Sequence, residues 1–271
     1  ADPNLASPKD GLSALLRAVI NGHSDIVRLL LDNQANPNVT HGETGVFALL
    51  LAVERSHIDT VKLLLMYQAD PNLINLKDRV FPLLKAVIMG DLDIVKLLLR
   101  NGADPNISYT QTGGFPLLLS LEGNHKDIAK LLLENQADPN AVNVQTGTFP
   151  LLLAVQDCDI EAVKLLLKNR ANPNIVHSET GISPLLLAVM NGSVEIVELL
   201  LRDKADPNTI HKETGSFPLL IAVESGQTET VSLLLNNGAN PNTANPNDGV
   251  FPLLLVAQNG DVEIAKLLLE N

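Results

Sequence analysis

Hydrophobic residues along the chain follow a pattern that repeats every 34 residues, and the triplet Leu-Leu-Leu at 29–31 returns at the same place in all eight periods. Each period opens with a polar turn, Ala-Asp-Pro-Asn or Ala-Asn-Pro-Asn, and we number its positions as slots 1 to 34. A fixed period of this size indicates a repeat solenoid, in which each unit buries its apolar side chains against its neighbours. We therefore predict one domain, a single array over residues 1–271. Its repeats are 1–34, 35–68, 69–102, 103–136, 137–170, 171–204, 205–238 and 239–271.

Within a repeat, the order of polar and apolar residues predicts a long turn followed by two short helices. In repeat 137–170, Pro, Asn and Gly are frequent in the first 14 slots, which is typical of turns. Pro150 then suits the first turn of a helix, and the apolar residues of 151–155 have helical spacing. A second apolar stripe predicts another helix from about Ile160 to Asn169. The pattern predicts an all-α fold with two short helices per repeat.

Two stretches carry a family resemblance. They are Gly-His-Ser-Asp-Ile-Val-Arg-Leu-Leu-Leu at 22–31 and Gly-Ala-Asp-Pro-Asn at 102–106. With these motifs the unit resembles the ankyrin repeat, over the whole chain, whereas tetratricopeptide repeats of the same period have longer helices. The resemblance implies an ankyrin-type helical solenoid with two short antiparallel helices and a hairpin-like turn per unit. The units depart from the family by one extra residue and by Phe-Pro-Leu-Leu in place of Thr-Pro-Leu-His, as at 115–118.

Phenylalanine and asparagine each occupy a fixed slot. All six phenylalanines fall at slot 13, where Ser13 and Ser183 stand in the other two repeats. We expect the rings to fill the space left by the missing Thr and His; the alternative is an exposed aromatic stripe for a partner. Asparagine occupies slot 4 in all eight repeats, and we expect its side chain to bond turn backbone.

The net charge of −12 narrows the classes of partner. No basic stripe exists, so neither nucleic acid nor an anionic membrane is an expected partner. A neutral or basic protein suits an acidic surface, although acidity could equally serve only to keep a long array in solution. The single cysteine, Cys158, cannot form an internal disulfide, and no signal peptide or bilayer-length apolar run is present. These features predict an intracellular, cytoplasmic protein, cut in phase with its repeats from a longer chain.

No catalytic, cofactor or metal motif emerges from the sequence. The chain has no phosphate-binding Gly-x-x-x-x-Gly-Lys motif and no Gly-x-Ser-x-Gly turn. His177 and His211 share a slot in adjacent repeats, which places them about 10 Å apart, too far for one zinc ion. Cys158 has no basic sequence neighbour that would lower its pKa. We therefore expect no enzyme activity, no cofactor and no metal.

A partner site in a solenoid is expected where residues vary between repeats while the framework stays constant. Slots 5–10, 12, 20 and 21 vary here, and the ankyrin resemblance implies that they lie on a concave binding face of hairpins and first helices. Repeat 69–102 stands out because it alone has a net positive charge and places two apolar residues at slots 20 and 21. Ordinary sequence drift is the alternative. The predicted partner-binding residues are Lys77, Arg79, Val80, Ile88, Met89, Tyr109, Glu122, Gln156 and Met190.

The leading functional prediction is a protein-binding scaffold or adaptor. A second class is a targeting or regulatory module of a larger enzyme or of a bacterial effector. A third is an architectural or self-assembling spacer. The last class draws on Leu267 to Leu269, which lack the polar capping repeat that solenoids normally need, so the ends of a truncated array could associate.

Overall fold

The computed structural model describes residues 1–109 and 111–271, which form sixteen α-helices and no strand. They divide into two compact units, Ala1–Asp138 and Pro139–Asn271. The first unit contains α1 (Ala14–Ile20), α2 (Ser24–Asp32), α3 (Ala48–Glu54), α4 (Ile58–Met66), α5 (Pro82–Met89), α6 (Leu92–Arg100), α7 (Pro116–Glu122) and α8 (Lys126–Glu134). The second contains α9 (Pro150–Gln156), α10 (Ile160–Lys168), α11 (Pro184–Met190), α12 (Val194–Arg202), α13 (Pro218–Glu224), α14 (Thr228–Asn236), α15 (Pro252–Asn259) and α16 (Val262–Glu270).

The helix pairs follow the 34-residue period, and their bounds agree closely with the sequence prediction. The predicted helices of repeat 137–170 are observed as α9 and α10. Proline begins six of the eight first helices, because its fixed φ suits the first helical turn and its missing N–H is not needed there. Slot 22 ends the first helix in the left-handed conformation, with Gly22 at φ 72° and Cys158 at φ 53°. The array boundaries over the whole chain stay a prediction.

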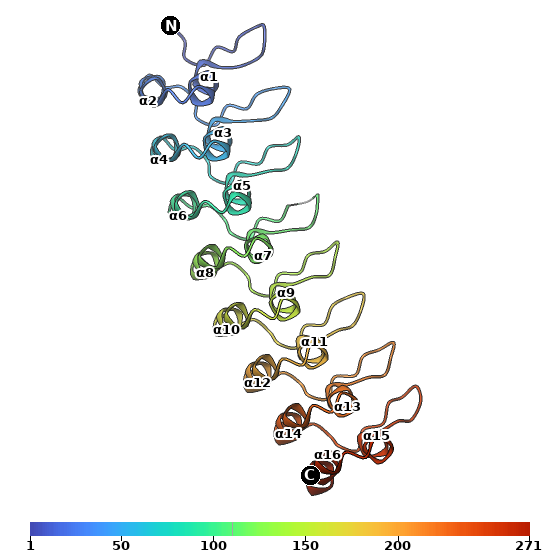
Figure 1. Cartoon of the computed structure of the whole chain (residues 1–271). Coiled ribbons are helices and arrows are strands. Elements are labelled where there is room, and N and C mark those ends of the chain that lie inside the picture. The colour runs from blue at the N-terminus through green and yellow to red at the C-terminus, as the bar shows by residue number, and fades with distance from the viewer. Residues whose placement is uncertain (110) are drawn as a thin grey trace. The chain divides into compact units, whose positions relative to one another are not determined.

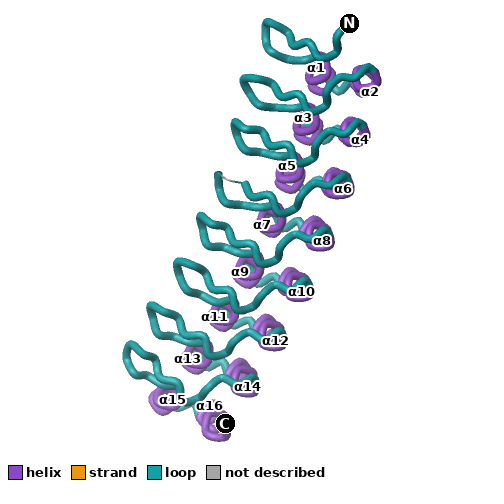
Figure 2. Tube along the Cα trace, turned by 180° about the vertical axis from the view of Figure 1, so that it is seen from behind, coloured by secondary structure: helices purple, strands orange, loops and turns teal. Residues whose placement is uncertain are grey.

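Each unit has two layers of helices. In the first unit the odd-numbered helices pack on one another in chain order, and so do the even-numbered ones. The second unit is built in the same way from α9 to α16. Figure 1 shows that the hairpins extend from the odd-numbered helices on the side away from the even-numbered ones, and Figure 2 shows the same order from behind. The core lies between the layers, where Val61 and Val163 are fully buried.

The slot-4 asparagines join neighbouring repeats. Within the first unit, Asn38 Nδ2 donates to the carbonyl of Gln68 at 3.3 Å, and Asn38 Oδ1 accepts the backbone N–H of Asp70 at 2.7 Å. The same pair of bonds is made within the two units by Asn4, Asn38, Asn72, Asn106, Asn140, Asn174 and Asn208. The prediction that Asn bonds turn backbone is confirmed, but the turn in question is that of the next repeat.

Side chains at slot 7 form a second set of hydrogen bonds between repeats, which connects neighbouring hairpins. His41 Nδ1 accepts the backbone N–H of Thr44 at 3.1 Å, so Nε2 carries the proton and donates to the carbonyl of Asp10 in the preceding repeat at 2.8 Å. His211 makes the equivalent bond to the carbonyl of Thr180, and Asn245 donates to that of Thr214 at 3.0 Å. The imidazoles of His41 and His211 are structural groups that hold their own hairpins against the preceding ones.

The phenylalanine column is buried, as the sequence predicts, in five of its six members. Phe47, Phe81, Phe115, Phe149 and Phe217 are buried, and only Phe251 in the last repeat is exposed. None of these six residues caps its helix with a side-chain hydrogen bond. Ser13 and Ser183 do so instead, accepting the backbone N–H groups of Leu16 and Leu186. At the start of the first helix, slot 13 thus provides either a phenylalanine ring, which is buried in five repeats, or a serine hydroxyl that caps the helix.

Candidate interaction surface

The variable slots lie on one face of each unit. We call this the hairpin face and define it by slots 5–10, 12, 20 and 21, that is, the hairpins and the C-terminal ends of the odd-numbered helices. Figure 1 shows these hairpins side by side along each unit. Of the predicted partner-binding residues, Val80 and Tyr109 are half-buried. The exposed ones are Lys77, Arg79, Ile88, Met89, Glu122, Gln156 and Met190.

Repeat 69–102 and its successor bring several of these residues onto packed elements. Ile88 and Met89 end α5, Glu122 ends α7, and these two helices pack against each other. Ile88 is 54% exposed and Met89 is 40% exposed. Gln156 and Met190 end α9 and α11, which pack in the second unit. The predicted partner-binding residues therefore form two local groups in the structure, one in each unit, whereas the sequence suggested a single set.

Charged groups lie in the same repeat as the apolar pair at the end of α5 and in the two neighbouring repeats. Lys85 forms an ion pair with Glu54 at 3.4 Å, which joins α5 to α3 on the hairpin face. Partial burial raises the pKa of the Glu122 carboxyl above its usual value, because the charged form loses hydration. Arg79 occupies a left-handed position with φ 62°, where most other repeats have glycine. An apolar centre with charged neighbours is the usual anatomy of a protein interface.

A cavity lies on the hairpin face of the first unit, between the hairpins of repeats 35–68 and 69–102. Its volume is about 450 Å³. Besides Lys77 it is lined by Thr40, His41, Gly42, Gly45, Asp70, Asn72, Leu73, Ile74 and Leu76. Sequence reasoning identified only Lys77 among these. A comparison of slot 8 across the eight repeats would have pointed to this cavity, since Gly42 is the one glycine in that slot.

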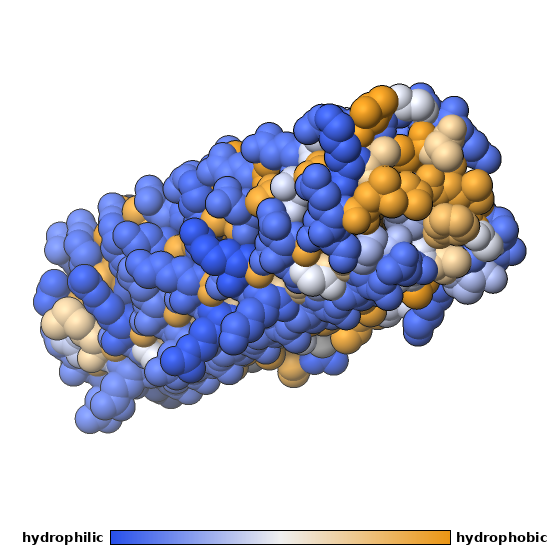
Figure 3. Space-filling view, turned by 90° about the horizontal axis from the view of Figure 1, so that it is seen from below, coloured by the Kyte–Doolittle hydropathy of each residue, from blue (hydrophilic) through white to orange (hydrophobic). Residues whose placement is uncertain are grey.

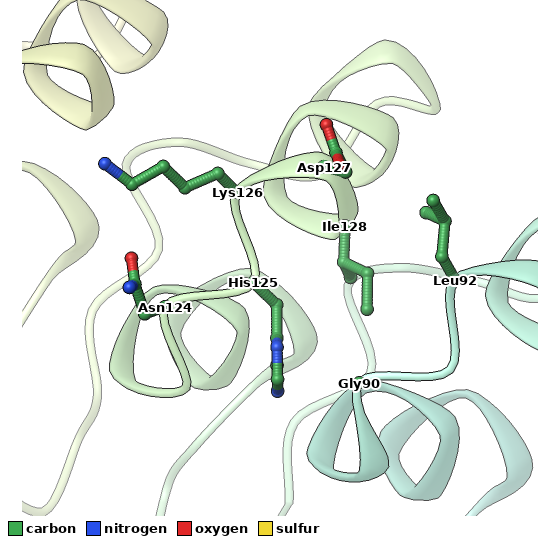
Figure 4. A pocket seen from close by; sticks show the side chains of 7 residues that line it. All are labelled: Gly90, Leu92, Asn124, His125, Lys126, Asp127 and Ile128. Carbon is green, nitrogen blue, oxygen red and sulfur yellow. The ribbon is translucent and has the colours of Figure 1, made fainter.

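A second cavity, of about 400 Å³, lies between the inter-helix turns of repeats 69–102 and 103–136. His125 is aimed at Gly90, and a Cβ atom at Gly90 would lie only 2.6 Å from the imidazole. Figure 4 shows that Lys126 and Asp127 point in other directions, so the titratable groups do not converge on the cavity. The cavity follows from close packing of histidine on a turn glycine.

An apolar surface covers the last repeat. Figure 3, seen from below Figure 1, shows hydrophobic side chains gathered there. The exposed members include Leu254, Val262 and Leu269, next to a shallow cavity of about 210 Å³ that is lined by Leu253 and Ala257. The end-to-end association that the sequence suggested for such an end stays a prediction.

Comparison with known families decides the identity of the fold. A model described as ankyrin repeats (3 copies) matches residues 1–75, 70–143, 151–245 and 185–271. The chain belongs to the ankyrin repeat family. No curated protein matches the chain. Ankyrin repeats are generally protein–protein interaction modules and typically carry no catalytic activity.

Among residues 1–109 and 111–271, no group of three or more His, Cys, Asp or Glu side chains could hold a metal ion. In the same part of the chain, no helix combines the length and apolar character needed to cross a bilayer. His23, His57 and His125 directly precede the second helices of their ankyrin repeats.

Proposed function

We propose that this ankyrin repeat protein is a scaffold or adaptor that binds a protein partner on its hairpin face. One observation carries the proposal: among the described residues, the variable slots 6, 8–10, 20 and 21 are mostly exposed on this face, while constant framework residues such as those at slots 27 and 4 are buried or bonded between repeats. Val61, Val95 and Val163 exemplify the constant core at slot 27. Ile88 and Met190 exemplify the variable, exposed positions at slot 20. Residues on such a surface can be exchanged, which changes the partner that is bound, without loss of the fold.

The charge of the hairpin face supports a neutral or basic partner. In the second unit, Asp157, Glu179, Glu213 and Glu224 are all exposed on this face. The net charge of the chain is −12, so the long-range field favours approach of positively charged surfaces. An intracellular, cytoplasmic location is part of the same proposal, supported by the single cysteine of the chain.

The apolar pair Ile88 and Met89 is the proposed centre of contact in the first unit. Ile88 is 54% exposed and Met89 40% exposed, and the same repeat carries the basic residues Lys77, Arg79 and Lys85. Desolvated apolar residues near the centre of an interface commonly carry most of the binding free energy. Glu122 and Tyr109, in the next repeat, are proposed to extend this contact.

An affinity pull-down followed by mass spectrometry would identify a partner, and calorimetry would then give its affinity. We expect the double substitution Ile88→Glu and Met89→Glu to weaken binding at least about tenfold, because two charges would enter a desolvated contact. Met66→Glu is the matched control, since Met66 is exposed at the end of a second helix, off the hairpin face. Unchanged affinity of the double variant, or equal weakening by Met66→Glu, would remove this site from the proposal.

A further inference from the structure

The cavity between the hairpins of repeats 35–68 and 69–102, here called the hairpin cavity, exists because one side chain is missing. Gly42 occupies slot 8, and a Cβ atom placed on it would meet nothing within 4 Å. Leu76 occupies slot 8 of the next repeat and is 73% exposed. The cavity of about 450 Å³ thus has an uncovered leucine in its lining, together with one position, Gly42, that carries no side chain.

The walls of the hairpin cavity are held in place by hydrogen bonds. His41 is buried, and its ring bonds both Thr44 in its own hairpin and the carbonyl of Asp10 in the preceding one. Asn75 is buried between Ile74 and Leu76, and its Oδ1 accepts the backbone N–H of Lys77 at 3.0 Å. A site that is already formed loses less conformational entropy when it binds a ligand.

Positive charge lies at one side of the hairpin cavity. Lys77 lines it together with one acid, Asp70, and Arg79 follows two residues after Lys77; both basic side chains are exposed. The neighbouring acids already accept backbone hydrogen bonds, Asp70 from Asn72 at 2.9 Å and Asp78 from Val80 at 3.1 Å. Lys77 is thus the lysine that lines the hairpin cavity, and Arg79 is the next basic residue along the same hairpin.

We propose that the hairpin cavity binds a peptide segment that presents one bulky apolar side chain followed by a carboxylate. The apolar side chain packs on Leu76 and Ile74 in the space beside Gly42, and the carboxylate pairs with Lys77 and Arg79. A volume of about 450 Å³ lies within the usual range of ligand pockets and is ample for one large side chain. The proposal rests on the proposed protein-binding function and names the chemistry of one contact within it. The rest of the partner can still be neutral or basic.

Nuclear magnetic resonance of the ¹⁵N-labelled chain, titrated with short peptides, tests this directly. The probe is the tetrapeptide Ser-Phe-Glu-Ser with blocked ends, compared with Ser-Phe-Lys-Ser and Ser-Ser-Glu-Ser. We expect Ser-Phe-Glu-Ser to shift amide signals of residues 40–45 and 70–80 only. We also expect the lysine peptide to bind at least about threefold more weakly, through loss of charge attraction, and the peptide without phenylalanine to give no saturable shifts.

Two variants, each with a matched control, separate the apolar contact from the charged one. Gly42→Leu fills the space without strain, because Gly42 does not have a positive φ, and should weaken Ser-Phe-Glu-Ser binding about tenfold. Ser178→Leu adds the same side chain at slot 8 of another repeat and should leave binding unchanged. Lys77→Gln should reduce the preference for the glutamate peptide over the lysine peptide, whereas Lys9→Gln, at slot 9 of the first repeat, should not.

The proposal would be overturned if Ser-Phe-Glu-Ser caused no amide shifts, or shifts scattered over the chain. It would also be overturned if the Gly42→Leu variant bound this peptide as tightly as the original chain does. The proposed function fails in a different way, through a partner that binds without using the hairpin face at all. A partner whose affinity falls with the Ile88 and Met89 substitutions but not with Gly42→Leu would retain the proposed function and exclude the hairpin cavity.

Discussion

The side chain of Asn72 accepts a hydrogen bond from the backbone N–H of Asp104, 32 residues further along the chain, at 2.7 Å. Its Nδ2 also donates to the carbonyl of Gly102 at 2.8 Å. One amide group thus satisfies both a donor and an acceptor in the turn that joins its own repeat to the next one. Since the same geometry recurs at slot 4 within each unit, it provides a polar link between repeats in addition to helix packing.

We expect Asn72→Ala to lower the free energy of unfolding by about 1–2 kcal/mol, because two hydrogen bonds of about 0.5–1.5 kcal/mol each are lost and water replaces part of them. Asn242→Ala is the control, since Asn242 occupies slot 4 of the last described repeat and its side chain makes no such bond to another repeat there. It should change stability by less than about 0.5 kcal/mol. Urea denaturation followed by circular dichroism measures both, and equal losses would show that Asn acts only within its own turn.

The second prediction concerns the phenylalanine column. Phe149 is 1% exposed and Phe251 is 38% exposed at the same slot. We expect Phe149→Ala to cost about 3–5 kcal/mol and to lower the thermal midpoint clearly, because a large buried ring leaves a cavity. Phe251→Ala should cost less than half as much. Comparable midpoints for the two variants would mean that slot 13 does not stabilise through burial.

Much of this fold follows from the spacing of apolar residues. The Leu-Leu-Leu triplet, the slot-14 proline and the left-handed slot 22 are local signals, so the helices around Pro150 and Ile160 could be located to within a residue or two. The inter-repeat bonds of Asn72 and His41 are different, because they join residues about 30 positions apart and depend on how one repeat sits on the next. Sequence identifies these residues as constant or polar without identifying their partners.

The candidate site was predicted only in part for a related reason. Ile88 and Met89 could be found because an apolar residue at a variable slot is a positive signal. The hairpin cavity depends on the absence of a side chain at Gly42, and this absence matters only once Leu76 is placed beside it. Only the structure shows that the predicted partner-binding residues are divided between two units.

A third prediction uses slot 22, where Cys158 has φ 53° and Gly192 has φ 69°. A side chain in the left-handed region costs about 1–2 kcal/mol, partly offset by the smaller entropy of a non-glycine residue in the unfolded chain. We therefore expect Cys158→Gly to raise the denaturation midpoint slightly and Gly192→Cys to lower it. At Gly192 the nearest atom to an added Cβ is 3.9 Å away, so backbone strain alone is measured. Cys158→Ser should change little, and a gain from that variant would instead implicate the thiol.

The last prediction compares one residue type at one slot of successive repeats. Leu235 in α14 is 6% exposed, whereas Leu269 in α16 is 71% exposed. Slot 31 is buried in every earlier repeat, so we infer that the repeat which follows covers it. Leu235→Ala should then cost about 2–5 kcal/mol, and Leu269→Ala less than about 0.5 kcal/mol, because only the first substitution opens a cavity. Equal losses in urea denaturation would mean that Leu269 is covered in solution. Light scattering on the same sample would then distinguish a second copy of the chain, which doubles the mass, from rearrangement within one molecule, which leaves it unchanged.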